Sequence, residues 1–306
     1  MTTLADPAAS VAAPGARVSA RDLLALMKPR ITLMVVITFM GGYYLAPGQP
    51  PTPRALWALL GTVLIVSGAN ALNMYIERVT DGLMHRTRKR PLPSGRLQPE
   101  VALWFGVALA LASLPILALG ANLLTAGLGL FALLSYVLAY TPMKRRSPTS
   151  LLIGSVPGAI PPLMGWTAAR GAIETPGLML FAVMFVWQVP HFLAIALYSA
   201  EDYARGGIKV LPLVEGERVA KRQIVAFTGA LIPVSLGLVP LHIAGPWFSG
   251  TAMLGGLLFL GMAMRGLWPG ADRAWARRLF LVSLLYLTAL FVVLGVEGRH
   301  LARSVH

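Results

Sequence analysis

Residues 55–82 read ALWALLGTVLIVSGANALNMYIERVTDG, an apolar run that passes directly into polar and acidic side chains. The apolar part is long enough to cross the hydrocarbon core of a bilayer as a helix, which takes about 20 residues. Asn73, Glu77 and Asp81 follow one another at intervals of four, which places them on one face of a helix. The segment therefore predicts a membrane helix that carries three oxygen-bearing side chains at its end.

Apolar stretches of similar length recur along the whole chain. Of 306 residues, 56% are hydrophobic and only 12% are charged, which is too little charge to cover the surface of a soluble fold. The fold class we predict is therefore all-α, a polytopic membrane bundle of nine transmembrane helices. The expected spans are 31–46, 55–76, 101–119, 121–140, 151–168, 178–199, 224–243, 247–266 and 279–297.

The remaining composition limits the chemistry and the domain organisation. The chain has no cysteine, which excludes disulfide, zinc-thiolate and iron–sulfur sites. Residues 1–20 are rich in Ala and Pro without the pattern of a signal peptide, so we expect a disordered tail. Residues 21–306 are expected to form a single transmembrane domain. Its first span is short, and a helix kinked at Pro29 would lengthen it.

The net charge of +14 is distributed unevenly along the chain. With nine spans, 22 of the 26 Lys and Arg residues lie at the N-terminus or in the loops on that same side. Cytoplasmic loops carry such an excess, so the N-terminus is expected in the cytoplasm. The charge is thus mainly a topology signal, and no nucleic-acid-binding module accompanies it.

A run of cations follows the acids of the second span. Arg86, Arg88, Lys89 and Arg90 come within ten residues of Asp81. Two carboxylates and an amide oxygen suit Mg²⁺, and guanidinium groups suit phosphate oxygens, so the pair of features favours an anionic diphosphate as ligand. The alternative is that the acids neutralise the arginines at a helix end, while the arginines fix the topology.

The sixth span carries a second polar cluster, in the sequence FVWQVPHFLAIALYSAEDYARG of residues 185–206. Gln188, His191, Tyr198 and Asp202 fall on one stripe at helical spacing, with Asp202 about three turns beyond His191 and Glu201 beside it. Polar groups inside a span indicate a site that faces the bundle interior. Asp202 with Glu201 is a second candidate metal group. His191 is a candidate ligand or base, or a partner in an interhelical hydrogen bond.

Further cations flank the first and fourth spans. Lys28 and Arg30 precede the first span, and Lys144 and Arg145 follow Tyr140 in the sequence YTPMKRR. Their roles are open between phosphate contact and topology. Six Gly and Pro residues make the fifth span thin and allow neighbouring helices to approach closely. These are Gly154, Pro157, Gly158, Pro161, Pro162 and Gly165.

These motifs together resemble the UbiA-type intramembrane prenyltransferases, and within them the branch that acts on heme. The resemblance covers about residues 22–300. It is carried by LMKPR, by the Asn73 helix with RTRKRPLP, by YTPMKR, by the Gly154–Trp166 segment and by WQVPHF followed by Glu201-Asp202-Tyr203. It implies transfer of a farnesyl group from farnesyl diphosphate to a vinyl group of heme B, with water addition, and Mg²⁺ as cofactor.

The resemblance and the residue chemistry together define a candidate site. The residues expected in catalysis are Asn73, Glu77, Asp81 and Asp202, and those expected to hold Mg²⁺ are the same four with Glu201. The diphosphate is expected to contact Lys28, Arg30, Arg86, Arg88, Lys89, Arg90, Lys144 and Arg145. Heme is expected to contact Gln188, His191 and Tyr198.

The resemblance also implies a multi-pass protein of the bacterial inner membrane, in contact with lipid, with a heme A synthase as a candidate recipient of the product. Three alternatives stay open at this point. One is a related prenyltransferase that acts on a quinone precursor or a chlorophyll-type acceptor. The others are a transporter, for which broken helices and buried polar groups are equally expected, and a non-catalytic heme-binding protein.

Overall fold

The computed structural model describes residues 18–48 and 52–304, and within them every regular element is helical. The predicted all-α fold is confirmed. The helices are α1 (Ala20–Leu26), α2 (Pro29–Leu45), α3 (Thr52–Leu83), α4 (Pro99–Gly120), α5 (Leu123–Leu134), the π-helix η1 (Ser135–Tyr140), α6 (Thr141–Met143), α7 (Ser150–Arg170), α8 (Thr175–Tyr198), α9 (Ala200–Arg205), α10 (Leu211–Val214), α11 (Glu217–Leu236), α12 (Pro246–Met264), the 3-10 turn η2 (Arg265–Leu267) and α13 (Arg273–Ser304).

Eight of these described helices, counting α5 to α6 as one, are long and apolar enough to cross a membrane. The pair α1 and α2 passes the same test together but is bent by 52°, and it brings the number to nine when it is counted as one broken span. The bend differs from the expected kink at Pro29, because Pro29 begins α2 and the break lies just before it, at Lys28 with φ of 49°. Proline is favoured in the first turn of a helix, because the N–H group that it lacks would have no partner within the helix there. The expectation for residues 1–17 lies outside the described residues.

The seventh span differs most from its predicted bounds. The apolar pattern indicated 224–243, whereas α11 covers Glu217–Leu236. Gly216, with φ of 91°, allows the chain to turn just before the charged first turn of α11. Residues 237–245 leave the helix and form turns, although they are largely apolar. Hydropathy alone therefore misplaced this helix by about two turns.

Helix α7 lies at the centre of the bundle and is 72% buried within its most apolar window. Its glycines permit the close approach that the sequence suggested. A Cβ on Gly165 would overlap the carbonyl oxygen of Phe39 in α2, and one on Gly42 of α2 would overlap the carbonyl oxygen of Pro162. The backbones of α2 and α7 therefore touch directly, which holds the N-terminal helices against the middle of the chain.

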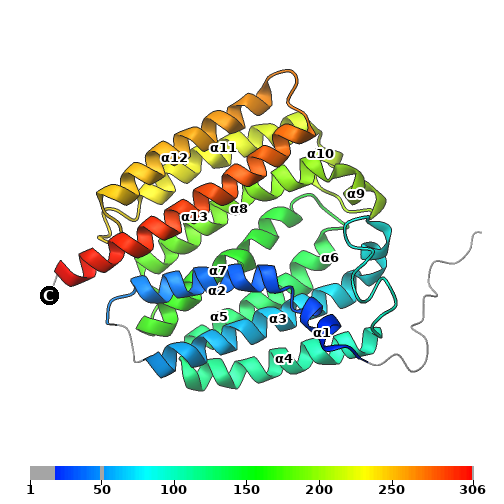
Figure 1. Cartoon of the computed structure of the whole chain (residues 1–306), viewed down its shortest axis with the longest axis horizontal. Coiled ribbons are helices and arrows are strands. Elements are labelled where there is room, and N and C mark those ends of the chain that lie inside the picture. The colour runs from blue at the N-terminus through cyan, green and yellow to red at the C-terminus, as the bar shows by residue number, and fades with distance from the viewer. Residues whose placement is uncertain (1–17, 49–51, 305–306) are drawn as a thin grey trace, which may run out of the picture.

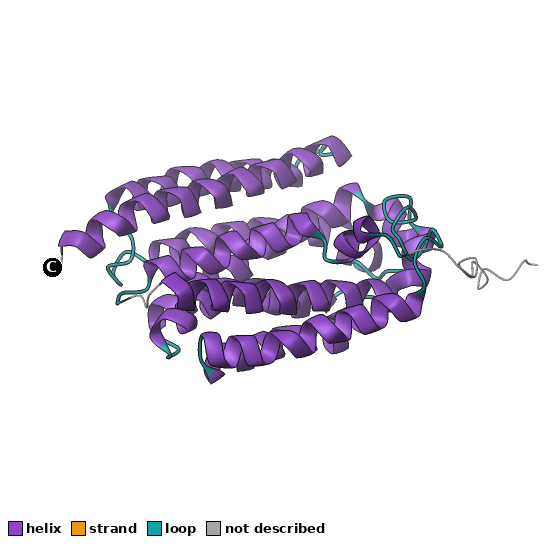
Figure 2. Cartoon of the chain, turned by 60° about the horizontal axis from the view of Figure 1, so that its bottom comes forward, coloured by secondary structure: helices purple, strands orange, loops and turns teal. Residues whose placement is uncertain are grey.

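The long helices run side by side, and the short ones gather at one end of the bundle (Figures 1 and 2). There α1, α9 and α10 lie near the basic loop, which we define as residues 84–98 between α3 and α4. The two halves of the chain also meet laterally, since α13 packs against both α2 and α8. The fold thus brings the polar segments of the sequence to the same end.

At the opposite end, Glu297 connects α13 to the N-terminus of α12. This buried carboxylate accepts backbone N–H groups of Gly245 at 3.0 Å, Trp247 at 2.9 Å and Phe248 at 2.9 Å. These donors surround the N-terminus of α12, where backbone N–H groups have no partner within the helix. Glu297 therefore caps α12 from another helix.

We expect Glu297→Ala to reduce the free energy of unfolding by about 3 kcal/mol, because three buried donors lose a charged acceptor. Thermal unfolding of the purified protein in detergent would measure the loss. The exposed Glu215 provides the control, and Glu215→Ala should leave the transition unchanged. Equal transitions for the two variants would contradict the capping role.

Candidate functional site

Three side chains on successive turns of α3, here called the polar face of α3, each bind a cation from another segment. Helix α3 is unbroken to Leu83, so Asn73, Glu77 and Asp81 lie along one side of it. Asn73 and Asp81 are buried and Glu77 is nearly so. The contacts are Lys28 Nζ to Asn73 Oδ1 at 2.7 Å, Lys144 Nζ to Glu77 Oε1 at 2.8 Å and Arg90 Nη1 to Asp81 Oδ2 at 2.7 Å.

The three cations come from three separate chain segments. Lys28 stands at the break between α1 and α2, Lys144 follows α6, and Arg90 belongs to the basic loop. Each segment leaves its helix at the same end of the bundle, so their side chains converge on α3. Sequence position alone had left Lys28 and Lys144 undecided between topology and a site. In the structure both lysines contact the polar face of α3.

The π-helix η1 helps to orient the side chain of Asn73. Asn73 Nδ2 donates to Thr141 Oγ1 at 3.1 Å, and Thr141 Oγ1 donates to the carbonyl of Tyr136 at 2.8 Å. These bonds turn the amide oxygen of Asn73 toward Lys28. A π-helix shifts the residues that follow it around the helix axis, and such segments are frequent at functional sites. The nitrogen of Lys144 also lies over the ring of Tyr140, 4.4 Å from its centre.

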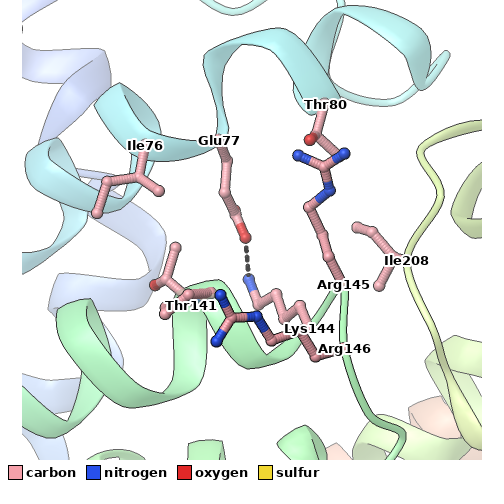
Figure 3. A pocket seen from close by; sticks show the side chains of 9 residues that line it. Ile76, Glu77, Thr80, Thr141, Lys144, Arg145, Arg146 and Ile208 are labelled. Atoms are coloured by element: carbon pink, nitrogen blue, oxygen red, sulfur yellow. Dashed lines mark hydrogen bonds and ion pairs between the residues drawn. The ribbon is translucent and has the colours of Figure 1, made fainter.

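A pocket of about 290 Å³ opens beside Glu77 (Figure 3). Glu77 reaches from α3 toward Lys144, and the wall combines cations with a few apolar groups. The sequence had not indicated Thr80, Thr141 or Ile208 for a site, because single neutral residues give no signal. The lining residues are Ile76, Glu77, Thr80, Thr141, Pro142, Lys144, Arg145, Arg146 and Ile208.

Asp202 is not on the same helix as His191, which corrects the expected stripe. Helix α8 ends at Tyr198, and Asp202 belongs to the short helix α9. Its carboxylate accepts the backbone N–H groups of His85 and Arg86, each at 3.1 Å. Asp202 thus ties α9 to the basic loop.

The electrostatics of Asp202 follow from these contacts. Partial burial alone would raise the pKa of the Asp202 carboxyl, but the N–H groups of Arg86 and His85 hold that pKa below its usual value. The contact therefore stabilises the fold above the ordinary pKa of aspartate. This stabilisation is lost as the pH falls through the lowered pKa.

The other predicted charged residues lie around this end. Glu201 is exposed and pairs with Arg273 of α13, away from the polar face of α3. The guanidinium of Arg86 stands 5.5 Å from the ring centre of Tyr203. Four predicted cations have exposed side chains, which an incoming anion can reach from solvent: Arg30, Arg88, Lys89 and Arg145.

The residues predicted for heme lie between helices. Gln188 Nε2 donates to the carbonyls of Ser155 at 3.2 Å and Met184 at 3.1 Å, so it faces α7. His191 Nδ1 is 2.8 Å from Ser283 Oγ of α13. Tyr198 contacts Phe280 of α13 edge-on, with ring centres 5.8 Å apart. His191 and Tyr198 therefore share the interface of α8 with α13, while Gln188 belongs to that with α7.

The donor set of the polar face of α3 suits Mg²⁺. Two carboxylates and one amide oxygen leave coordination positions for water and phosphate oxygens, as this ion prefers. Within residues 18–48 and 52–304, no three carboxylate, imidazole or thiol groups come together, so Glu201 and Asp202 do not join Glu77 and Asp81. Lys28, Lys144 and Arg90 already occupy the amide oxygen of Asn73 and one oxygen of each carboxylate, so a metal held here competes with these cations. A cation that the metal displaces is then free to bind an anion.

We therefore expect Mg²⁺ and inorganic pyrophosphate to bind cooperatively. Mg²⁺ alone should bind weakly, because it competes with the three cations for these oxygens. Pyrophosphate should raise the Mg²⁺ affinity by at least about 10-fold, because it binds the cations that the metal displaces. Calorimetric titration of the purified protein with Mg²⁺, with and without pyrophosphate, would measure this. Lys144→Met should bind Mg²⁺ alone more tightly and lose much of the enhancement. Equal Mg²⁺ affinities with and without pyrophosphate would contradict the exchange.

The membrane-helix bundle has an oxygen-rich helix face, three paired cations and a polar pocket at one end. This is the arrangement expected of a membrane protein that binds an anionic ligand. Residues 34–285 match the family model described as "UbiA prenyltransferase family", and the chain belongs to this family. The predicted resemblance is confirmed.

Curated relatives extend this similarity over nearly the full length. The protoheme IX farnesyltransferase of Myxococcus xanthus is 52% identical over 91% of this chain and 95% of its own. That of Sorangium cellulosum is 53% identical over 86% of this chain and 99% of its own. That of an Anaeromyxobacter species is 50% identical, with coverage of 95% and 98%.

Two solved structures have the same fold. A structure of digeranylgeranylglyceryl phosphate synthase superposes with a TM-score of 0.77 at 16% identity, covering 91% of this chain and 98% of that one. A UbiA homolog from Archaeoglobus fulgidus, solved with DMAPP and Mg²⁺, gives 0.63 at 16% identity, with coverage of 90% and 99%.

Proposed function

We propose that this chain transfers the farnesyl group of farnesyl diphosphate to a vinyl group of heme B, with addition of water, to give heme O and diphosphate. The observation that carries the reaction class is the polar face of α3 with its three cations beside the pocket. The relatives at 50–53% identity, each named for farnesyl transfer to protoheme IX, support the choice of substrates.

The proposed chemistry begins at the diphosphate. Asn73, Glu77 and Asp81 would hold Mg²⁺, which when bound neutralises the charge that grows on the leaving diphosphate. Lys28, Lys144 and Arg90 would bind the remaining oxygens. The cations at the rim would attract the anion and orient it from the aqueous side; these are Arg30, Arg86, Arg88, Lys89 and Arg145. Asp202 would act through the basic loop, which it anchors. From the sequence, Asp202 with Glu201 also stays a candidate second metal group, separate from the polar face of α3.

The allylic carbon–oxygen bond of farnesyl diphosphate then breaks, and that carbon bonds to the terminal carbon of the vinyl group. Water supplies a hydroxyl to the inner vinyl carbon and releases one proton. The allylic cation must be protected from earlier capture by water, so apolar walls of the membrane bundle suit the reaction. Gln188, His191 and Tyr198 are the residues we propose for contact with heme B.

We propose the bacterial inner membrane as the location, with the N-terminus in the cytoplasm and lipid around the helices. The 22 of 26 basic residues on one predicted side support this orientation. One prenyltransferase domain over residues 21–306 stays a prediction, as does a heme A synthase that receives the product.

An acceptor screen tests the substrate assignment. The purified protein would be incubated with labelled farnesyl diphosphate, Mg²⁺ and one of several acceptors: heme B, 4-hydroxybenzoate or a chlorophyllide. We expect label to be incorporated into the heme fraction only. Preferential labelling of the aromatic acid or the chlorophyllide would keep the reaction class and overturn the acceptor. Labelling of none would leave the transport or heme-binding alternatives.

A further inference from the structure

The imidazole ring of His191 is held by two aromatic rings and by a hydrogen bond. The imidazole is stacked on Trp187, with ring centres 4.5 Å apart, and lies 4.7 Å from the ring of Phe280. Its Nδ1 is 2.8 Å from Ser283 Oγ. The indole N–H of Trp187 donates to the carbonyl of Ser283 at 2.8 Å. Ser283 therefore contacts both the imidazole and the ring stacked on it.

The direction of the His191–Ser283 hydrogen bond follows from counting protons. A serine hydroxyl has one hydrogen, and that of Ser283 is donated to the carbonyl of Phe280, at a distance of 2.6 Å. Ser283 Oγ can then only accept from His191. The proton of the neutral imidazole is thereby assigned to Nδ1, and Nε2 carries a lone pair.

Nε2 has no protein partner in the described part of the chain and is not completely enclosed, although His191 as a whole is only 8% exposed. Within the described residues, the buried polar side-chain atoms without a partner are Ser67 Oγ and Thr228 Oγ1. Nε2 of His191 makes no hydrogen bond among these residues and is absent from that pair, so it is not sealed inside the protein. An unprotonated imidazole nitrogen without a protein partner can ligate heme iron, and a hydrogen bond from the opposite nitrogen raises its basicity.

We propose that Ser283 is a positioning residue, which holds His191 in the Nδ1–H tautomer so that Nε2 ligates the iron of heme B. The inference rests on the proposed function, because it takes heme B as the acceptor. In this arrangement α8 supplies the ligand and α13 supplies its orientation. The two aromatic rings keep the imidazole plane fixed, so Ser283 decides which nitrogen faces the substrate.

The chain offers a matched control. Ser113 of α4 is fully buried and makes the same bond to the carbonyl three residues before it, Ala110, also at 2.6 Å. Its hydroxyl makes no contact with an imidazole among the described residues. Ser113→Ala therefore removes a buried hydroxyl and a backbone contact of the same kind while leaving His191 untouched.

The test is titration of the purified full-length protein with ferric heme B, followed by visible absorption, for the wild type and for Ser283→Ala, Ser283→Thr, Ser113→Ala and His191→Ala. We expect the wild type and Ser113→Ala to share an imidazole-ligated spectrum. Ser283→Ala should bind heme B about 10-fold more weakly with an altered spectrum, and Ser283→Thr should restore both. His191→Ala should lose the ligation signature.

Thermal unfolding and pyrophosphate binding, measured on the same variants, separate a local effect from misfolding. An unchanged spectrum and affinity in Ser283→Ala, or a wild-type spectrum in His191→Ala, would overturn the inference. So would a failure of Ser283→Thr, correctly folded, to restore the spectrum. If the wild type binds heme B through His191 but does not farnesylate it, the proposed function fails while the positioning role of Ser283 stands.

Discussion

Asp81→Asn should reduce prenyl transfer by at least about 10³-fold while the bundle stays folded, because the amide keeps the volume and an oxygen for Arg90 but removes a charged Mg²⁺ ligand. Asp81→Ala should lose as much activity. Product formation at saturating Mg²⁺ and substrates would measure the effect, and thermal unfolding would confirm the fold. Chelation of Mg²⁺ in the wild type should give the same loss, reversibly.

The control for Asp81 is Glu217, an exposed acid of α11 that also pairs with a cation, Lys221. Glu217→Gln should retain full activity. Turnover of Asp81→Asn close to that of the wild type, or full wild-type activity in excess chelator, would exclude a metal-assisted reaction at the polar face of α3.

The second large effect is that two substitutions should each change the apparent KM for a different substrate. Arg90→Gln should raise the apparent KM for farnesyl diphosphate by about 10- to 100-fold and leave that for heme B unchanged, because it removes a charge-assisted phosphate contact. His191→Ala should do the reverse. Steady-state kinetics with each substrate varied in turn would measure both.

Substitution of an exposed cation of the basic loop should also affect farnesyl diphosphate and not heme B. Arg88 is exposed, whereas Arg90 is half-buried against Asp81, so Arg88→Gln should have the smaller effect on farnesyl diphosphate. Arg222→Gln, which changes an exposed cation of α11 outside the candidate site, is the control. If His191→Ala left the use of heme B untouched, His191 would keep only its structural hydrogen bond to Ser283.

The membrane fold could be predicted from the sequence because its cause is local. A run of about 20 apolar residues crosses a bilayer as a helix whatever surrounds it, so hydropathy identified the spans. The prediction was wrong where a local break overrides hydropathy. Gly216 and Gly237 bound α11, although the apolar residues continue to Ala244. The break at Ser199, which separates α9 from α8, was missed for the same reason.

The polar face of α3 was predictable because spacing within one helix fixes it. Its partners were not, since Lys28, Lys144 and Arg90 are separated from it by loops whose path depends on tertiary packing. Ser283 gave no signal at all, because a serine in an apolar span is usually bonded to its own helix. Its contact with His191 requires α13 and α8 to be neighbours, which a single sequence does not reveal.

The most direct test of the central claim is mass analysis of heme extracted after incubation with farnesyl diphosphate and Mg²⁺ in ¹⁸O-labelled water. We predict a new heme whose mass has increased by one farnesyl group and one hydroxyl, with the label in that hydroxyl. The product should be absent with Asp81→Asn. Heme B recovered unchanged from active, Mg²⁺-loaded protein, or prenylated without added oxygen, would contradict the proposed reaction.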